Sequence, residues 1–213
     1  KQFLSDYQLM EWNEDNFDIE RLQYTREAYA AGKYAFVSDV ARIEALYQYG
    51  GFYMDTDVEV LKSFNPLLEA QCILGMEEKE YVATSFMAFE KGHPLVKEFL
   101  NLYEHLSFLD EKGQIIAGTN VAKLTKMLKE KGFVQENHYQ ELENGIQIYP
   151  KEFFSPYDYI NCHYNITENS YCVHHFAVSW MSKKEQVKKG IKKRIVKILG
   201  PEKMNGIREK LKR

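Results

Sequence analysis

Two aspartates, Asp55 and Asp57, follow a pair of glycines and a short apolar run in the stretch GGFYMDTDVEV at residues 50–60. Side chains two residues apart in an extended segment share one face, so we expect Tyr53 and Glu59 on the same face as the aspartates. Two carboxylates at this spacing repel each other, and a proton or a divalent cation such as Mn²⁺ or Mg²⁺ relieves the repulsion. The pattern therefore predicts a metal site, and the alternative is a polar strand face that only meets water.

Two adjacent histidines, His174 and His175, lie in the apolar stretch SYCVHHFAVSW at residues 170–180. Alternation along a strand sends neighbouring side chains to opposite faces, so we expect at most one of them to face the metal. For each histidine the alternative is a core residue with satisfied hydrogen bonds.

A helix is predicted from Asp39 onward, and Gly50 supplies its stop. Asp39 and Arg42 lie three residues apart on its predicted first turn and so share a face. The alternatives are that Asp39 is a plain helix N-cap and that Arg42 makes an internal ion pair with Asp55 or Glu44.

The rest of the chain alternates between strand and helix signals. Short apolar blocks indicate strands, and apolar residues recurring every three or four positions indicate helices. This alternation favours an α/β fold over an all-helical or all-β fold. Strands are predicted at residues 7–12, 34–39, 52–61, 72–77 and 81–90, and strands beside loops within residues 146–156 and 170–180. Helices are predicted within residues 13–34, at 40–50, at 93–106 and from 118 onward.

Composition limits the class of protein. The 213 residues are 45% hydrophobic and 14% aromatic, which is enough to bury one sizeable core. No apolar run is long enough to cross a bilayer, and the first ten residues lack the order of a secretory signal, so we expect a cytoplasmic protein. An odd number of cysteines without CxxC spacing argues against a disulfide framework and a zinc cluster. Reduced, buried thiols are expected at Cys72, Cys162 and Cys172.

Charge divides the chain into an acidic body, residues 1–182, and a basic tail, residues 183–213. The tail holds 13 lysines and arginines against three glutamates and so carries +10, which leaves −13 on the body. Val187, Ile191 and Ile195 recur every four residues among lysines, a pattern typical of a helix lying on an anionic membrane surface. We expect the tail to hold the protein at the inner face of the cell membrane, the alternative being a helix packed on the body. No nucleic-acid partner is expected.

The stretch YAFVSDVARIEALYQYGGFYMDTDVEVLKSF, residues 34–64, closely resembles the SD-x-x-R … L-Y-x-x-G-G-x-Y-x-D-x-D block of the DXD-containing glycosyltransferases of family 32. These include capsular polysaccharide and lipopolysaccharide transferases of bacteria, and the glucosylating toxins share the block distantly. KGHPLV, GTNVAKLT and VHHFAVSW follow in the order that the family leads one to expect. The resemblance spans residues 7–180 and implies a GT-A type fold, a Rossmann-like mixed sheet flanked by helices. The family's usual first strand and helix have no counterpart in this sequence.

The resemblance also implies roles for individual residues. Asp57 is implied as a direct metal ligand, and Asp55 as a ligand through water or a partner of ribose and sugar hydroxyls. His174 is preferred over His175 as a further ligand. Contacts to the nucleotide sugar are implied for Asp39, Arg42, Tyr53, Asn120, Ser179 and Trp180. The last two can donate hydrogen bonds to the departing diphosphate, where charge develops.

The implied function is a metal-dependent transfer of a sugar, with retention, from a UDP- or GDP-linked donor to a hydroxyl of a saccharide acceptor. With the basic tail, this leads to the hypothesis of a lipid-linked acceptor in bacterial surface polysaccharide synthesis. Thr119 and Asn120 stand where the family commonly has a Gly-Pro pair, which leaves the sugar and the acceptor undefined. Two alternatives stay open: a DxD-type phosphatase and a catalytically inactive module that binds nucleotide sugars.

Overall fold

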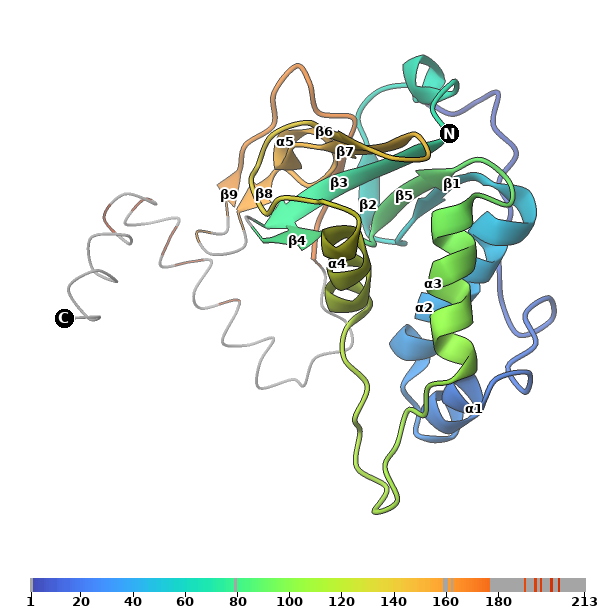
Figure 1. Cartoon of the computed structure of the whole chain (residues 1–213). Coiled ribbons are helices and arrows are strands. Elements are labelled where there is room, and N and C mark those ends of the chain that lie inside the picture. The colour runs from blue at the N-terminus through green and yellow to red at the C-terminus, as the bar shows by residue number, and fades with distance from the viewer. Residues whose placement is uncertain are drawn as a thin grey trace.

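The protein is described by a computed structural model over residues 2–78, 80–158, 161 and 163–176, with residues 190, 194, 196, 200 and 203. A six-stranded mixed sheet lies at its centre, and helices α1, α2 and α3 gather at one side of it (Figure 1). This arrangement confirms the predicted α/β class with a mixed sheet flanked by helices, and it is consistent with a GT-A type fold. Most of the tail lies outside the described residues, so the division at residue 182 stays a prediction.

Helices and strands alternate along the described part of the chain. The helices are α1 (Gln23–Ala30), α2 (Tyr34–Tyr49), the 3₁₀ helix η1 (Asn65–Leu67), α3 (Pro94–Glu104), α4 (Asn120–Glu130) and α5 (Lys151–Phe154). The strands are β1 (Gly51–Met54), β2 (Val58–Val60), β3 (Cys72–Glu78), β4 (Tyr81–Val82), β5 (Phe86–Phe89), β6 (Gln140–Leu142), β7 (Ile146–Tyr149), β8 (Tyr157–Asp158), β9 (His163–Tyr164) and β10 (Cys172–His174). The predicted helices at residues 93–106 and from 118 onward are confirmed as α3 and α4.

The main sheet has the strand order β1, β5, β3, β7, β6, and β4 pairs with β3 beside this path. Strands β3 and β7 run parallel, whereas the other neighbours in the order are antiparallel. Two smaller antiparallel pairs, β2 with β10 and β8 with β9, stand apart from it. Strand β1 is thus an edge strand of the main sheet, and it leads directly into the two aspartates.

Alternation along the strands supplies two apolar clusters on opposite faces of the main sheet. In β5, Met87 and Phe89 pack in the cluster that contains the helix residues, whereas Phe86 and Ala88 pack in the second. The second cluster is aromatic, and the Phe86 and Phe154 rings stack in it with centroids 4.1 Å apart. A sheet covered on both faces explains why β5 is buried along its whole length.

Two predicted strands near the N-terminus are wrong. Residues 7–12 form no strand, and Leu9 in this segment is 82% exposed. Residues 34–39 are the first turns of α2 instead of a strand. Val37 and Val40, three residues apart, both face the core, which is helical spacing. A short apolar block does not by itself distinguish a buried strand from a buried helix segment.

The predicted strand at residues 52–61 is interrupted at the aspartates. It divides into β1 and β2, which belong to different sheets, and a turn closed by a hydrogen bond from Val58 N to Asp55 O at 3.0 Å separates them. The expectation that four alternate side chains share one strand face is therefore wrong beyond Asp55. Glu59 lies past the turn and pairs with His175 instead.

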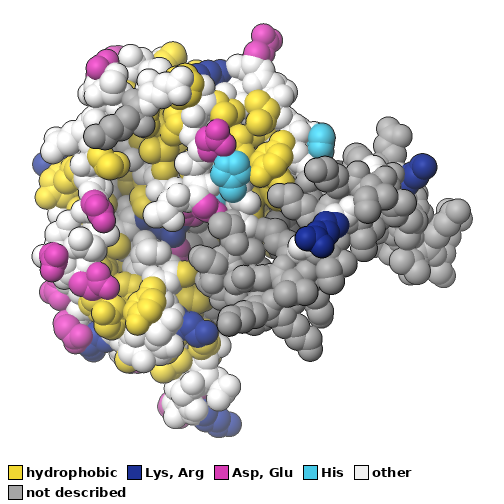
Figure 2. Space-filling model, turned by 180° about the vertical axis from the view of Figure 1, so that it is seen from behind, with side chains coloured by type: hydrophobic (Ala, Val, Ile, Leu, Met, Phe, Trp, Pro, Cys, Tyr) yellow, Lys and Arg dark blue, Asp and Glu magenta, His cyan; other side chains and the backbone are white. Residues whose placement is uncertain are grey.

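Cys72 and Cys172 are buried free thiols, as predicted, and Cys162 lies outside the described residues. Among the described helices none is long and apolar enough to span a membrane. On the face seen in Figure 2, several acidic side chains gather at the lower left edge, and others lie singly between apolar side chains.

Gly50 and Gly51 join α2 to β1 and offer a test of this junction. Gly50 has φ 70° and ψ −159°, a conformation essentially restricted to glycine, and a Cβ atom would lie 2.6 Å from Lys91 N. Gly51 has φ 89°, but a Cβ atom there meets open space. We expect Gly51→Ala to lower the free energy of unfolding by about 1 to 2 kcal/mol, and Gly50→Ala by about 3 kcal/mol or more.

Urea denaturation of both variants measures the difference. Equal losses at the two positions would contradict the close backbone packing of Gly50 against the segment that follows β5.

Candidate metal and sugar site

The end of β1 places the first aspartate. Asp55 continues the pairing of β1 with β5, because its backbone N–H donates to Ser85 O at 2.9 Å. The chain then turns through Thr56 and Asp57 and enters β2. Asp55 and Asp57 therefore lie in a turn between two sheets, where their side chains can converge on a third residue.

Strand β10 brings that third residue from more than 100 positions away. It pairs with β2 so that His174 stands opposite Val58, the residue after Asp57. His174 Nε2 lies 3.2 Å from Asp57 Oδ1 and 4.0 Å from Asp55 Oδ2. One ligand atom from each of these three residues lies within 4.8 Å of the other two.

His175 points to a different set of partners, as strand alternation predicts. Its Nε2 lies 2.9 Å from Glu59 Oε2, and its Nδ1 lies 2.8 Å from the Tyr164 hydroxyl. Its backbone N–H donates to Asp57 O at 3.1 Å, so it helps to hold the turn. Of the two histidines, the structure directs His174 at the aspartates.

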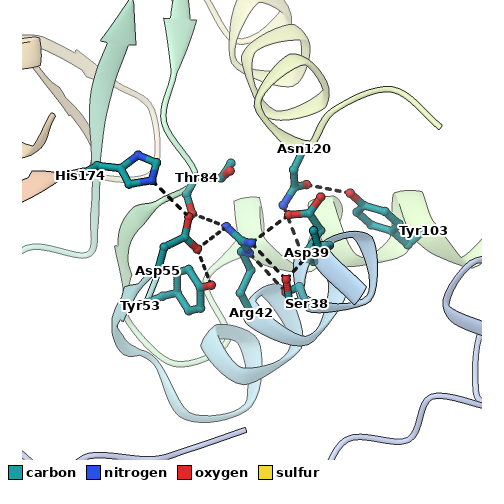
Figure 3. Close-up of polar contacts among 10 residues, drawn as sticks. Ser38, Asp39, Arg42, Tyr53, Asp55, Thr84, Tyr103, Asn120 and His174 are labelled. Carbon is teal, nitrogen blue, oxygen red and sulfur yellow. Dashed lines mark hydrogen bonds and ion pairs between the residues drawn. The ribbon is translucent and has the colours of Figure 1, made fainter. Parts of the chain in front are cut away.

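Arg42 lies at the centre of the polar network (Figure 3). Its side chain is 8% exposed, and its guanidinium forms ion pairs of 3.0 Å with both Asp39 and Asp55. Further hydrogen bonds run to Thr84 O at 2.8 Å, to Ser38 O at 3.3 Å and to Ser38 Oγ at 3.4 Å. The five N–H groups of the guanidinium thus face five acceptor atoms. Glu44, the other predicted partner, pairs with Arg21.

Contacts to its two carboxylate oxygens orient the Asp55 side chain. Oδ1 receives the Arg42 ion pair and a hydrogen bond of 2.7 Å from the Tyr53 hydroxyl, and the Tyr53 ring lies against the guanidinium, 4.7 Å from its carbon to the ring centroid. Oδ2 is the oxygen nearer to His174. The carboxylate is therefore fixed by Arg42 and Tyr53 on one side and directed toward His174 on the other.

Asp39 is a buried acid with a perturbed pKa. Burial raises the pKa of its carboxyl group to about 6, against the lowering effect of Arg42. Burial lowers the pKa of Arg42, but Asp39, Tyr53 and Asp55 together raise it above its usual value. Arg42 is therefore charged at neutral pH. Asp39 is an interior residue of α2, which begins at Tyr34. The N-cap alternative for Asp39 is excluded.

Asn120 reaches Asp39 from another helix. It is the first residue of α4, whose N-cap Thr119 accepts a hydrogen bond from Ala122 N at 3.2 Å. Its Nδ2 donates to Asp39 O at 3.4 Å, and its Oδ1 accepts from the Tyr103 hydroxyl at 2.7 Å. The network therefore joins α2, α3, α4 and β1.

The donor atoms of Asp55, Asp57 and His174 fit a divalent cation. An ion that holds its ligands about 2.1 Å away spans about 4 Å between opposite ligands, close to the separations found. Carboxylates suit both Mg²⁺ and Mn²⁺, but an imidazole nitrogen suits transition-metal ions better than Mg²⁺. The mixed oxygen and nitrogen set therefore favours Mn²⁺ of the two. Burial lowers the pKa of His174 against the opposing effect of Asp57 and Asp55.

Most of the residues singled out in the sequence lie in one network. The structure brings together Asp39, Arg42, Tyr53, Asp55, Asp57, Asn120 and His174, whereas Ser179 and Trp180 lie outside the described residues. Sequence reasoning missed Thr84, Ser38 and Tyr103. The first contributes a backbone oxygen, which no side-chain pattern reports. Tyr103 lies on the apolar face of α3, where a tyrosine is read as a core residue.

Comparisons with known proteins point to one class of enzyme. Residues 2–74 match a family model described as "Glycosyltransferase sugar-binding region containing DXD motif". The chain is 32% identical over 125 residues to lactosylceramide 4-alpha-galactosyltransferase of Mus musculus, over 59% of this chain and 33% of that protein. It is 31% identical over 71 residues to inositol phosphoceramide mannosyltransferase 3 of Schizosaccharomyces pombe, over 33% of this chain and 20% of that protein.

The matches cover only part of each relative, which limits the conclusions that can be drawn from them. The chain spans about a third of the length of the mouse relative and less of the yeast relative. No solved structure matches the chain. The relatives are named glycosyltransferases of eukaryotes, so the matches support a glycosyltransferase without supporting a role in bacterial capsules.

The two histidines allow a matched test of the metal site. We expect His174→Gln to weaken Mn²⁺ binding about 10-fold or more, because it removes one of three ligand atoms. His175→Gln is the control, since this side chain faces Glu59 and Tyr164. Electron paramagnetic resonance of free Mn²⁺ measures binding without any donor or acceptor. Equal losses in the two variants would contradict the assignment of His174.

Proposed function

We propose that this chain is a member of the DXD glycosyltransferases and transfers a sugar from a nucleoside diphosphate sugar to a hydroxyl group, with Mn²⁺ as its metal. The observation that carries the proposal is the convergence of Asp55, Asp57 and His174, next to a second acid, Asp39, held by the same arginine. The match of residues 2–74 to the DXD family model supports it independently of geometry.

Each side chain of the network has a task in this proposal. Asp57, Asp55 and His174 hold the cation, which when bound neutralises charge on the diphosphate leaving group. The Asp39 carboxylate accepts hydrogen bonds from sugar hydroxyls, and the Asn120 amide donates hydrogen bonds to them. Arg42 holds Asp39 and Asp55 in place, because its N–H groups are directed at protein acceptors. This assigns Arg42 to positioning, where the sequence predicted a contact to the sugar.

The departing diphosphate needs hydrogen-bond donors as negative charge develops on it. Ser179 and Trp180 follow β10 by a few residues, and β10 carries His174 to the cation site. We assign this donor role to their hydroxyl and indole N–H on the resemblance alone. Retention of configuration at the transferred sugar belongs to the same part of the proposal.

The acceptor is proposed to be a saccharide carried on a lipid. The mouse and yeast relatives are named for lactosylceramide and inositol phosphoceramide, both lipids with a polar headgroup. The basic tail fits this acceptor class because a lipid-linked saccharide lies at a membrane surface. The cytoplasmic location and the role in bacterial surface polysaccharide synthesis that the sequence led us to expect stay predictions.

Donor binding gives the first test. With Mn²⁺ present, we expect one member of a panel of UDP-galactose, UDP-glucose and GDP-mannose to raise the melting temperature by several degrees. A ligand at about 100 times its Kd stabilises the native state by about 2.7 kcal/mol. Asp57→Ala removes a cation ligand and is expected to abolish the shift. A thermal-shift assay measures both.

The outcomes separate the alternatives. Absence of a shift with every donor would overturn the proposal. A shift without release of nucleoside diphosphate on adding a glycolipid acceptor would favour an inactive binding module. Release of phosphate from model phosphate esters, insensitive to nucleotide sugars, would favour a phosphatase.

The tail proposal has its own test. Lys192 and Lys193 belong to the segment 183–213 with net charge +10. Replacing both by Gln is expected to weaken binding to phosphatidylserine-rich vesicles about 30-fold, at about 1 kcal/mol for each basic residue near the surface. Lys126→Gln with Lys129→Gln, on exposed positions of α4, is the matched control. Co-sedimentation measures binding, and equal losses in the two variants would contradict docking through the tail.

A further inference from the structure

A buried hydroxyl reaches the candidate site from a helix that carries none of its predicted residues. Tyr103 lies on α3 with its side chain fully buried, and its hydroxyl donates to Asn120 Oδ1 at 2.7 Å. The amide of Asn120 in turn donates from Nδ2 to Asp39 O (Figure 3). Tyr103, Asn120 and Asp39 thus form a chain of hydrogen bonds across α3, α4 and α2.

The two ends of the Asn120 amide are not equivalent in this chain. An amide has an acceptor oxygen and a donor NH₂ group of nearly the same shape. Oδ1 accepts from the Tyr103 hydroxyl, and Nδ2 donates to the backbone oxygen of Asp39. The reversed amide would set Oδ1 against an oxygen of Asp39, with no proton between them. The backbone oxygen of Asp39 can only accept, so it sets which end of the amide faces it, and the Tyr103 hydroxyl holds the other end by donating to Oδ1.

The position is closed in around this bond. The Tyr103 ring packs edge-on against Tyr24, with ring centroids 4.9 Å apart, and the ammonium group of Lys123 lies 5.5 Å from the Tyr103 ring centroid. Burial makes the hydroxyl bond costly to lose, because a buried polar group without a partner forfeits its hydration. The ring is held by packing and the amide is held by the hydroxyl, so the two contributions can be separated by experiment.

We propose that Tyr103 is a positioning residue for the donor sugar: it fixes the Asn120 amide so that Asn120 and Asp39 present a set arrangement of donor and acceptor groups to the sugar hydroxyls. Tyr103 itself does not touch the sugar. The proposal rests on the glycosyltransferase function proposed above, and it concerns recognition of the sugar and not of the diphosphate, which the cation side of the site receives.

The chain offers a matched control in the neighbouring ring. Tyr24 is as buried as Tyr103, but its hydroxyl has no hydrogen-bond partner in the part of the chain that the structure describes. Tyr24→Phe and Tyr103→Phe remove the same atom from two rings in contact. Only Tyr103→Phe releases the amide of Asn120.

Calorimetry with Mn²⁺ and two pairs of probes tests the proposal: UDP-galactose with UDP, and GDP-mannose with GDP. For the sugar nucleotide that the unmodified protein binds, we expect Tyr103→Phe to raise Kd about 3- to 10-fold, the range for one hydrogen bond. The Kd of the bare diphosphate is expected to stay unchanged. Tyr24→Phe is expected to change neither Kd, and Tyr103→Phe is expected to add nothing in an Asn120→Ala background.

Each other outcome overturns a definite statement. If Tyr103→Phe leaves both Kd values unchanged, or raises them equally, the positioning role is wrong and the proposed function stands. An equal effect of Tyr24→Phe, or a full additional loss in the Asn120→Ala background, also rules out action through Asn120. If the unmodified protein binds none of the four probes, the proposed function fails and the positioning role fails with it.

Discussion

The buried guanidinium of Arg42 is the interaction on which the site depends. A buried charge costs several kcal/mol unless it is paired and hydrogen-bonded, and Arg42 meets that cost with two carboxylates and further acceptors in Ser38 and Thr84. Because Arg42 and Asp39 are on α2 and Asp55 directly follows β1, the same contacts hold the helix against the edge strand of the sheet. A lysine at this position could satisfy fewer of the acceptors, since it lacks the planar five-donor fork.

A second constraint is the pairing of β2 with β10. Strand β1 of the main sheet stops just before Asp55, and the chain then enters β2, which belongs to a different sheet. In that second sheet β2 pairs with β10, which brings His174 to the aspartates. The register that sets His174 opposite Val58 accomplishes this, and a slip of one residue would exchange the places of His174 and His175. The bond from His175 N to Asp57 O and the side-chain contact of His175 with Glu59 oppose such a slip.

The α/β class and the helices α3 and α4 could be predicted from periodicity and spacing, whereas the grouping of Asp39, Arg42 and Asp55 was implied by the resemblance to the DXD glycosyltransferases. The N-terminal strand assignments failed for a physical reason: the apolar block at residues 34–39 suits a helix face as well as a strand, and only packing decides between them. The turn at Asp55 was also beyond reach, because strand alternation gives no signal where a chain changes sheets. Backbone acceptors such as Thr84 O and a core tyrosine such as Tyr103 leave no mark in the sequence.

The bridge through Arg42 also bears on cooperativity. One guanidinium touches both Asp39, the carboxylate proposed to face the sugar, and Asp55, a carboxylate proposed to hold the cation, so charge withdrawn from Asp55 by a bound cation would change how strongly Arg42 is drawn to Asp39. Occupancy of one half of the site then alters the free energy of occupying the other, and such coupling is reciprocal. On this view the cation and the sugar act as mutual effectors, linked through a single side chain that belongs to neither.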